Sequence, residues 1–310
     1  MKRLSIGLTG LALLIAVTTV SAGDESGGYA GSFLSFGAGA RAAALGQAYS
    51  ACANDASAPL FNPAGLAHSA GGEIAATYAL VFQDRTVSYL GGSYAFQPVT
   101  IGAGWLRLGI SDMDVWSDLG QPTGETFSDA ESAFMLAAGK TVVSGPKYSL
   151  SVGAGFKYLR HTLWNNAADG LGFDFGVLGT IHMTSVLKHI NVAAVVQNVG
   201  ATMTWDTESE HEDEVPMTMR FGVALASASC PADLMCDIEK IEDRDARLHL
   251  GAQYTWEKIA FRAGLNDDEF TAGAGFSFVL SQHDLAVDYA FTDDDISSDG
   301  IHYFSFRLAF

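Results

Sequence analysis

The sequence closes with Ile301-His-Tyr-Phe-Ser-Phe-Arg-Leu-Ala-Phe310, and this stretch decides the expected fold. Successive side chains of a β-strand point to opposite faces, so Phe304, Phe306 and Phe310 would share one apolar face with Leu308. The opposite face would carry Tyr303, Ser305, Arg307 and Ala309. Such a strand suits an outer-membrane barrel, where one face contacts lipid and the other faces a polar lumen. An ordinary half-buried core strand alternates in the same way, so the rest of the sequence must decide.

The same alternation recurs through the chain. In the second half, for example, Phe270, Phe276 and Phe278 alternate with Thr271 and Gly275. We count about 13 such stretches of roughly 9–11 residues or more, the length that crosses a bilayer as a tilted strand. Single-chain bacterial barrels have an even number of strands, so one strand is missed or merged in this count. We therefore expect an all-β fold, a transmembrane antiparallel β-barrel.

The connections between these stretches differ in length. Short turns are expected at Gln83–Arg85 and Gln97-Pro98. Long acidic loops are expected at Ser111–Asp129, Ala201–Pro216 and Ser227–Asp245. Short turns are typical of the periplasmic end of an outer-membrane barrel, and long loops are typical of its outer end.

Two further features bear on the architecture. The alternation breaks near Trp105 and Arg107, which predicts a β-bulge there. A soluble β-sandwich or propeller is the competing fold, but it would bury both faces of some strands. A propeller would also need Gly- and Asp-rich blade repeats, which the sequence does not contain.

The N-terminus has the features of a secretory signal peptide. Lys2 and Arg3 are positively charged, Leu8 to Val20 is apolar, and Ala22 ends a small-residue cleavage site. A membrane anchor is the alternative, but the apolar run is shorter than the roughly 20 residues that span a bilayer. We expect residues 1–22 to be a signal peptide, residues 23–70 a leader and plug, and residues 71–310 the outer-membrane barrel.

The charge balance excludes one class of partner. The chain has 35 Asp and Glu against 17 Lys and Arg, and removal of Lys2 and Arg3 leaves 15 basic residues. A protein this acidic is not expected to bind nucleic acid, whose phosphates repel it. The acidic runs are interpreted as solvated loops.

The three cysteines do not form a metal-binding pattern. Cys230 and Cys236 lie six positions apart in a loop-like stretch, and an oxidising compartment would permit a disulfide between them. Cys52 is then left over as a small buried residue. No histidine pair accompanies the cysteines at zinc-site spacing, so no metal is expected there.

No catalytic or cofactor motif was found. The eight histidines are scattered, and the sequence has neither a Gly-x-Ser-x-Gly elbow nor a phosphate-binding or dinucleotide fingerprint in the required context. The aspartates at 293–295 and Asp299 could bind calcium, but their spacing matches no known loop, which favours a solvated loop. We expect a protein that is not an enzyme and that has no cofactor.

The stretch before the first strand has a different character. Gly37 to Leu66 is rich in alanine and small residues and shows no strand alternation, so short helices and tight turns are expected. Asn62 followed by Pro63 is typical of a helix start, and Gly65 would let the chain leave that turn with positive φ. Such a segment before a barrel would form a compact plug inside the lumen.

Several motifs of this stretch resemble the PorV/PorQ family, which is related in fold to the FadL-type outer-membrane transporters. The motifs are Gly39-Ala40-Arg41, Leu45-Gly46-Gln47-Ala48-Tyr49, Asn54-Asp55-Ala56-Ser57-Ala58 and Phe61-Asn62-Pro63-Ala64-Gly65-Leu66. Val196-Gln197-Asn198-Val199-Gly200 and the C-terminal strands are also similar. The resemblance implies fourteen strands. It also implies a plug motif that contains Arg41, Asn54, Asp55, Asn62, Pro63 and Gly65.

Two functions follow from the resemblance. As in the FadL type, the barrel would carry a hydrophobic solute across the outer membrane. As in PorV-like members, it would instead bind a secreted protein or subunits of the type IX secretion system. Its other expected partners are outer-membrane lipid and the barrel assembly machinery, for which Phe306 and Phe310 would form the recognition signal.

Charged residues on the small or polar strand faces are the remaining candidates for function. By alternation they would point into the lumen, where they could hold the plug by ion pairs or line a solute path. The structural role is the more common one for charges in a polar barrel interior. The candidates are Asp174, Arg220, Arg247, Arg262, Asp288 and Arg307.

Overall fold

The structure is a computed structural model that describes residues 28–183, 186–293 and 299–310. The expected signal peptide, residues 1–22, lies outside the described residues. Among the helices of the described part, none has the length and apolar character needed to cross a membrane.

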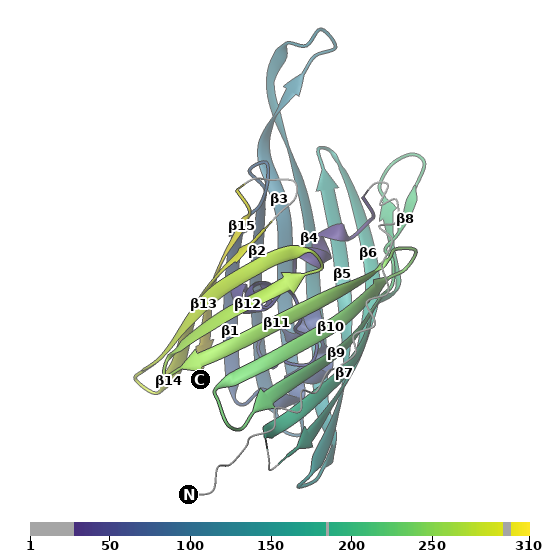
Figure 1. Ribbon diagram of the computed structural model, residues 1–310. Coiled ribbons are helices and arrows are strands. Elements are labelled where there is room, and N and C mark those ends of the chain that lie inside the picture. The colour runs from purple at the N-terminus through teal and green to yellow at the C-terminus, as the bar shows by residue number, and fades with distance from the viewer. Residues whose placement is uncertain (1–27, 184–185, 294–298) are drawn as a thin grey trace, which may run out of the picture.

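The described strands form one closed antiparallel barrel (Figure 1). Neighbours along the chain pair with each other, β1 pairs with β15, and β6 pairs with β7, which closes the ring. The short strand β8, Glu212–Glu214, only extends the edge of β7, so fourteen strands make the wall. These are β1 Gly72–Leu80, β2 Thr86–Phe96, β3 Val99–Trp116, β4 Pro122–Ser144, β5 Tyr148–Leu163, β6 Asn166–His182, β7 Leu187–Trp205, β9 Thr218–Ser227, β10 Ala232–Ile241, β11 Ala246–Trp256, β12 Ile259–Asn266, β13 Glu269–Leu280, β14 His283–Thr292 and β15 Ile301–Ala309. The expected barrel class is confirmed.

The strand missed in the sequence is β10, which lies within the expected loop Ser227–Asp245. Its outward residues Leu234 and Ile238 are half exposed, whereas Asp237 and Glu239 point inward and are buried. A strand with carboxylates on its inner face has the composition of an acidic loop. The expectation of a loop was therefore wrong.

The expected loop Ser111–Asp129 is also wrong. Strands β3 and β4 continue through most of it and form a hairpin that projects beyond the barrel (Figure 1). Their burial alternates only weakly there, because both faces of the hairpin are open to their surroundings. Without a buried face, the pattern that identifies a strand is lost.

No bulge occurs at Trp105 and Arg107, contrary to the sequence expectation. The pairing of β2 with β3 runs through both residues without a shift, and β3 first breaks register against β4 between Ile110 and Met113. Leu106 and Leu108 are buried on the inner face, so this face is locally apolar. Side chains still point alternately to the two faces of β3. Because the inner face carries leucines here instead of small or polar residues, the alternation is not visible in the sequence.

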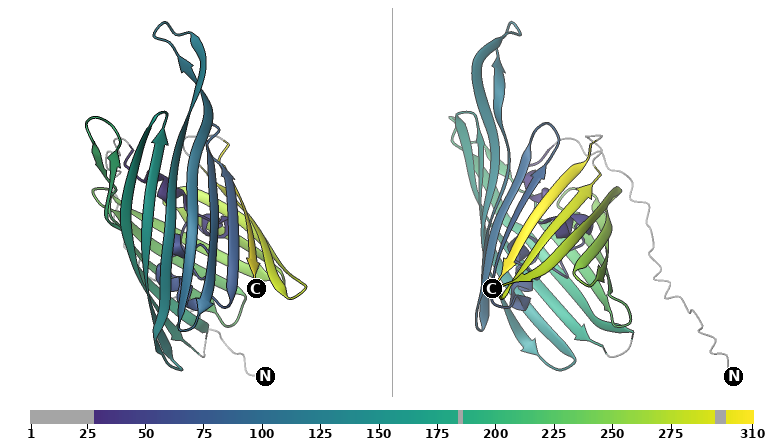
Figure 2. Two further views of the ribbon diagram at one scale, coloured as in Figure 1. Left: turned by 180° about the vertical axis from the view of Figure 1, so that it is seen from behind. Right: turned by 90° about the vertical axis from the view of Figure 1, so that its left-hand side faces the viewer.

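The two mouths of the barrel carry different connections. The C-terminal end, where Phe310 lies, has short turns such as 97–98, 257–258 and 281–282. The hairpin end, from which β3 and β4 project, has longer connections, including 206–217 (Figure 2). Consecutive hairpin turns alternate between ends, so Gln83–Arg85 lies at the hairpin end. The expectation that it shares an end with Gln97-Pro98 was wrong.

The outside of the wall is apolar. Large side chains alternate outward on successive strands and are 40–60% exposed, for example Tyr78, Phe134, Phe221, Phe261 and Phe304. The inward positions are small or polar. This arrangement is typical of barrels that stand in lipid.

The segment from residue 28 to Gly71 lies inside the barrel (Figure 2). It contains the short helices η1 Ser32–Phe36, α1 Ala40–Ala44, α2 Ala58–Phe61 and η2 Pro63–His68. Most of its alanines are fully buried, and helix η2 packs on β4, β5 and β6 while α1 packs on β13 and β14. We call residues 28–71 the internal segment.

Candidate functional site

Glycines on the inner wall let the internal segment approach the strands closely. A Cβ atom on Gly139 would lie 2.6 Å from the Pro63 carbonyl oxygen, and one on Gly153 would overlap the Pro63 backbone. A Cβ on Gly176 would overlap the Asn62 side chain. Helix η2 therefore rests directly on the backbone of three neighbouring strands.

The opposite wall receives the segment in the same way. A Cβ atom on Gly251 would lie 2.7 Å from the Leu45 carbonyl oxygen, and one on Gly264 would overlap the backbone at Gly46. The Thr271 hydroxyl donates to the Ala44 carbonyl oxygen at 3.2 Å. The segment is thus held between two facing walls.

The Asn62-Pro63 motif fixes the fold of the segment itself. The Asn62 side chain accepts a hydrogen bond from Ala64 N at 3.0 Å and donates to the Ser50 carbonyl oxygen at 2.8 Å. Pro63 is the first residue of η2, as expected. Gly65 does not have positive φ, so that expectation was wrong; a Cβ there would overlap the Ala53 carbonyl oxygen. Close backbone packing explains this glycine.

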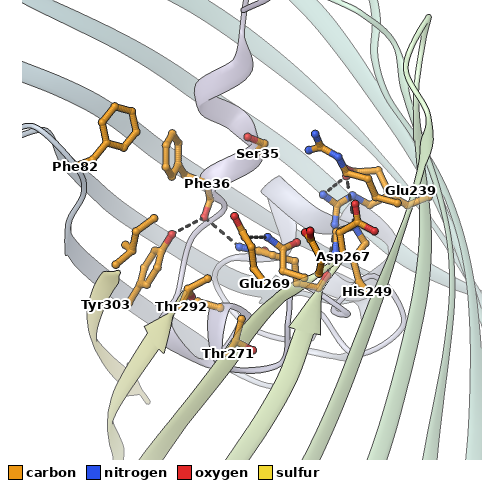
Figure 3. Close-up of a pocket in the computed structure, with 17 residues that line it drawn as sticks. Ser35, Phe36, Phe82, Glu239, His249, Asp267, Glu269, Thr271, Thr292 and Tyr303 are labelled. Carbon is orange, nitrogen blue, oxygen red and sulfur yellow. Dashed lines mark hydrogen bonds and ion pairs between the residues drawn. The ribbon is translucent and has the colours of Figure 1, made fainter. Parts of the chain in front are cut away.

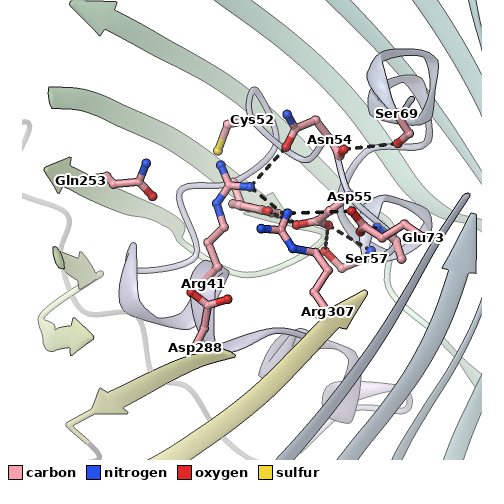
Figure 4. A network of polar contacts seen from close by, with 12 residues as sticks. Arg41, Cys52, Asn54, Asp55, Ser57, Ser69, Glu73, Gln253, Asp288 and Arg307 are labelled. Carbon is pink, nitrogen blue, oxygen red and sulfur yellow. Dashed lines mark hydrogen bonds and ion pairs between the residues drawn. The ribbon is translucent and has the colours of Figure 1, made fainter. Parts of the chain in front are cut away.

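Arg41 and Asp55 lie at the centre of a polar network (Figure 4). Arg41 Nη1 donates to Asn54 Oδ1 at 3.2 Å and lies 3.7 Å from Asp55 Oδ2. The hydroxyl groups of Tyr49 and Ser57 also donate to the Asp55 carboxylate. Burial raises the pKa of Asp55, but Arg41 and these hydrogen bonds outweigh it, so its pKa lies below the ordinary value. Asp55 is therefore an anion, and its contacts with Arg41, Tyr49 and Ser57 hold this part of the internal segment together.

Two residues of the wall join this network to the barrel. Glu73 of β1 accepts a hydrogen bond from Ala56 N at 2.6 Å, and Arg307 of β15 lies 3.9 Å from the other Glu73 oxygen. Figure 4 shows Arg307 and Glu73 converging on the Asp55 side of the segment. Arg307, an expected lumen residue, thus supports the segment through Glu73.

Asp237 also holds the internal segment, and it is not among the residues expected from the sequence. Its Oδ2 accepts hydrogen bonds from Tyr49 N at 3.1 Å and from Ser50 N at 2.8 Å. It is fully buried and stands on β10, the strand that was interpreted as loop. Its signal was the alternation of Met235, Asp237 and Glu239 with apolar neighbours.

The other expected lumen residues also lie inside, most of them in ion pairs. Asp174 pairs with Lys157 at 3.1 Å, Arg262 with Asp288 at 2.6 Å, and Arg220 with Glu239. Arg247 lines a chamber described below. Lys157 and Glu239 were missed, although each follows the alternation of its strand. Each pair places a buried charge beside an opposite charge, which offsets the free-energy cost of removing both from water.

The Lys157–Asp174 pair gives a stability prediction. Both side chains are at most 2% exposed, so Lys157→Met leaves a buried carboxylate without its cation. We expect a loss of about 3–5 kcal/mol in the free energy of unfolding. Arg160→Met is the matched control on the same strand. It breaks a half-exposed pair with Asp169 and should cost less than about 1 kcal/mol. Urea unfolding in lipid vesicles measures both, and equal losses would contradict the account.

The internal segment separates two chambers of the lumen. The hairpin-side chamber has a volume of about 420 Å³ and is bounded by Phe36, Gln47 and residues of the hairpin end such as Phe82. The C-terminal chamber has a volume of about 750 Å³ and is bounded by Asn54, His68 and residues of the opposite end. Residues of the internal segment line the inner end of both chambers.

The remaining expectations concern sulfur and metal. Cys230 and Cys236 are both free in the structure, which does not contain the disulfide that their spacing would permit. Cys236 lies within β10, paired with Val223 and Leu250, and the extended strand carries it away from Cys230. No cluster of metal-ligating residues occurs within the described ranges. Residues 294–298 of the acidic run lie outside those ranges.

Comparisons with known proteins bear on the fold. No protein-family model matches the sequence, and no curated protein matches it. The solved structure of the Pseudomonas putida toluene transporter TodX is similar, with a TM-score of 0.58 and 13% identity over 88% of this chain and 96% of that one. The Ralstonia pickettii toluene transporter TbuX has a TM-score of 0.51 and 14% identity over the same shares. A Pseudomonas aeruginosa FadL homologue has 0.50 and 10%, over 86% and 96%.

This likeness shows the fold that the chain shares with FadL-type barrels. Its structural neighbours are channels and transporters rather than enzymes. The resemblance to the PorV/PorQ family is carried by the sequence motifs and stays a prediction.

Proposed function

We propose that the protein is an outer-membrane channel for small hydrophobic molecules, with residues 28–71 acting as its plug. The observation that carries the proposal is the internal segment, held between two chambers of a barrel with an apolar exterior. The shared fold with TodX and TbuX, whose structures are described as toluene transporters, supports the solute class.

The plug is expected to exclude a continuous water path. Its residues are almost all buried, and backbone contacts at Gly139 and Gly251 hold it against facing walls. A solute must therefore displace part of the segment or pass around it. The chamber at the hairpin end is the first place where such a solute would bind.

We propose that the hairpin end faces outward and the C-terminal end faces the periplasm. The longer connections lie at the hairpin end and the short turns at the other, which is the usual arrangement. A barrel in the outer membrane must be exported from the cytoplasm, which the sequence features of residues 1–22 predict.

A docking function is the second candidate. The hairpin of β3 and β4 projects beyond the barrel, and Trp116 and Leu119 near its tip are 60% and 86% exposed. Exposed apolar groups on a projecting element are a feature of protein contact sites. Secreted proteins would be the partners in this case.

Uptake by intact cells tests the transport proposal. Cells that produce the barrel should take up radiolabelled toluene faster than matched cells without it, because the lipopolysaccharide layer slows apolar solutes. Cells that produce a barrel without the hairpin tip, residues 112–127, should behave like the wild type. Equal uptake with and without the barrel would contradict transport. If removal of residues 112–127 abolished uptake, the exposed hairpin tip would be part of the function, which would favour docking.

A further inference from the structure

The internal segment begins at one mouth of the barrel and ends at the other. Its last residue, Gly71, accepts a hydrogen bond from Ala95 N at 3.0 Å, and the next residue, Gly72, exchanges two backbone hydrogen bonds of 2.8 Å with Phe310. Ala95 lies near the end of β2 that leads into the short turn 97–98, and Phe310 is the last residue of the chain. The segment therefore leaves the lumen at the C-terminal end.

The first described residues of the segment contact the opposite mouth. The Arg244 guanidinium lies 4.4 Å from the centre of the Tyr29 ring, and Arg244 belongs to the connection between β10 and β11. A Cβ atom on Gly31 would lie 2.8 Å from Cγ1 of Val215, the residue directly after β8. Both contacts are with connections of the hairpin end, and Figure 1 shows the purple start of the segment beside β8. The segment therefore enters the lumen at the hairpin end.

Between the two mouths the segment is fixed to the wall. On the hairpin side, the Phe36 carbonyl oxygen accepts hydrogen bonds from the Tyr303 hydroxyl of β15 at 3.3 Å and from Gln47 Nε2 at 3.1 Å (Figure 3). On the other side, His68 Nε2 lies within hydrogen-bond distance of the Ser151 hydroxyl of β5, at 3.3 Å, and His68 lines the C-terminal chamber. The segment thus runs as a thread through the whole lumen and does not enter and leave by the same mouth.

Little of the exported chain precedes the segment. If the signal peptide is removed after Ala22, as predicted, residues 23–27 separate the new N-terminus from Gly28. Five residues span at most roughly 18 Å, even when the chain is fully extended. The apolar core of a bilayer is roughly 30 Å thick, so the new N-terminus cannot reach the C-terminal mouth from Gly28. It is confined to the hairpin side of the barrel.

We infer that the barrel displays its own N-terminus on the outer surface of the cell. This inference rests on the outward orientation of the hairpin end proposed above, and it does not depend on the solute. The signal peptide is removed during export, so the free N-terminus starts in the periplasm. It must then pass outward through the lumen as the barrel forms. Folding of the barrel thereby carries the short acidic stretch Gly23-Asp-Glu-Ser-Gly27 across the outer membrane and presents it to the surroundings.

Three barrels with one cysteine each test the inference. Gly28→Cys marks the start of the segment, and no atom lies within 4 Å of a Cβ atom built there, so the substitution should not disturb the fold. Leu119→Cys marks the hairpin tip, where the native side chain is 86% exposed. The native Cys230, exposed in the turn between β9 and β10, marks the C-terminal end. All other cysteines are replaced by alanine in each barrel.

Intact cells are treated with a maleimide that is attached to a polymer too large to cross the outer membrane. We expect Gly28→Cys and Leu119→Cys to react on intact cells, and Cys230 to react only after the outer membrane is permeabilised, because a thiol must be accessible to be modified. A Gly28→Cys barrel that reacts only after permeabilisation, or not at all, would overturn the inference. Reaction of Cys230 on intact cells, with the other two positions protected, would reverse the orientation and also overturn it. Heat-modifiable mobility in gels shows whether each variant has folded.

An inserted epitope gives a second measurement that does not depend on cysteine chemistry. Placed between Gly27 and Gly28, it should bind antibody on intact cells, and external protease should remove it without cutting the barrel wall. The matched control carries the same epitope between Ser281 and Gln282, in the turn between β13 and β14 at the C-terminal end. The control should bind antibody only after permeabilisation. Equal antibody binding to the two epitopes on intact cells would contradict the display of the N-terminus alone.

The inference and the transport proposal can fail separately. Toluene uptake by cells whose Gly28→Cys barrel reacts only after permeabilisation would remove the display and leave the channel. Reaction of Gly28→Cys on intact cells without toluene uptake would remove the channel and leave the display.

Discussion

Removal of residues 38–69 from the chain is expected to convert the closed barrel into an open pore. These residues fill the lumen between the two chambers, and the wall behind them is lined by glycines and ion pairs that water would then reach. Conductance in planar lipid bilayers, and the entry of small sugars into liposomes, should rise by about an order of magnitude or more, as in barrels with a water-filled lumen.

The matched control is removal of residues 112–127, the projecting part of the β3–β4 hairpin. That deletion takes a segment from outside the barrel and should leave conductance at the wild-type level. A folded barrel that stays closed without residues 38–69 would contradict the role of the internal segment as a plug. Heat-modifiable mobility in gels shows whether each variant has folded.

Replacement of Phe306 and Phe310 by aspartate is expected to prevent insertion into the outer membrane. Phe306 points outward on β15, and both rings are about half exposed at the surface that we place in lipid. Each lost aromatic contact is worth about 2 kcal/mol, and the new carboxylates would have to be desolvated. If the two rings also form the assembly signal, the double variant should accumulate in the periplasm, as membrane fractionation would show.

Ser281→Asp with Gln282→Asp controls for the added charge. It introduces two carboxylates at the same end of the barrel, in the turn between β13 and β14, and keeps both aromatic rings. This variant should insert normally. Normal insertion of the phenylalanine double variant would contradict both the lipid-facing placement and the signal.

The barrel could be predicted because its outer face is apolar almost everywhere. Phe304 and Phe306 on β15, like Phe270 and Phe276 on β13, are separated by small or polar residues that face the lumen. A period of two is visible whenever one face differs strongly from the other. This difference between the apolar outer face and the small or polar inner face made most strands predictable from the sequence.

The same reasoning explains the failures. In β10 the inward Asp237 and Glu239 give a strand the composition of a loop, and in β3 the inward Leu106 and Leu108 remove the contrast between faces. The projecting hairpin has no buried face to reveal its alternation. In β10 and β3 the residues of the inner face decide the outcome, whereas in the projecting hairpin the lack of a buried face does.

The candidate site could be predicted only in part. Alternation placed Arg220, Arg262 and Asp288 inside the lumen, but their partners depend on the register between neighbouring strands. The contacts of Asp237 with Tyr49 and Ser50 join residues almost 190 positions apart. Gly65 was identified for the wrong reason, because its constraint comes from the Ala53 carbonyl rather than from its own φ.

Mass spectrometry of the barrel, purified gently from its own outer membrane, tests the central claim most directly. One spectrum reads bound small molecules and co-purified proteins together. The account predicts an apolar small molecule at about one per barrel, and no protein partner in fixed ratio. Secreted proteins or secretion subunits in fixed ratio, with no small molecule in the lumen, would contradict it and assign the barrel to docking.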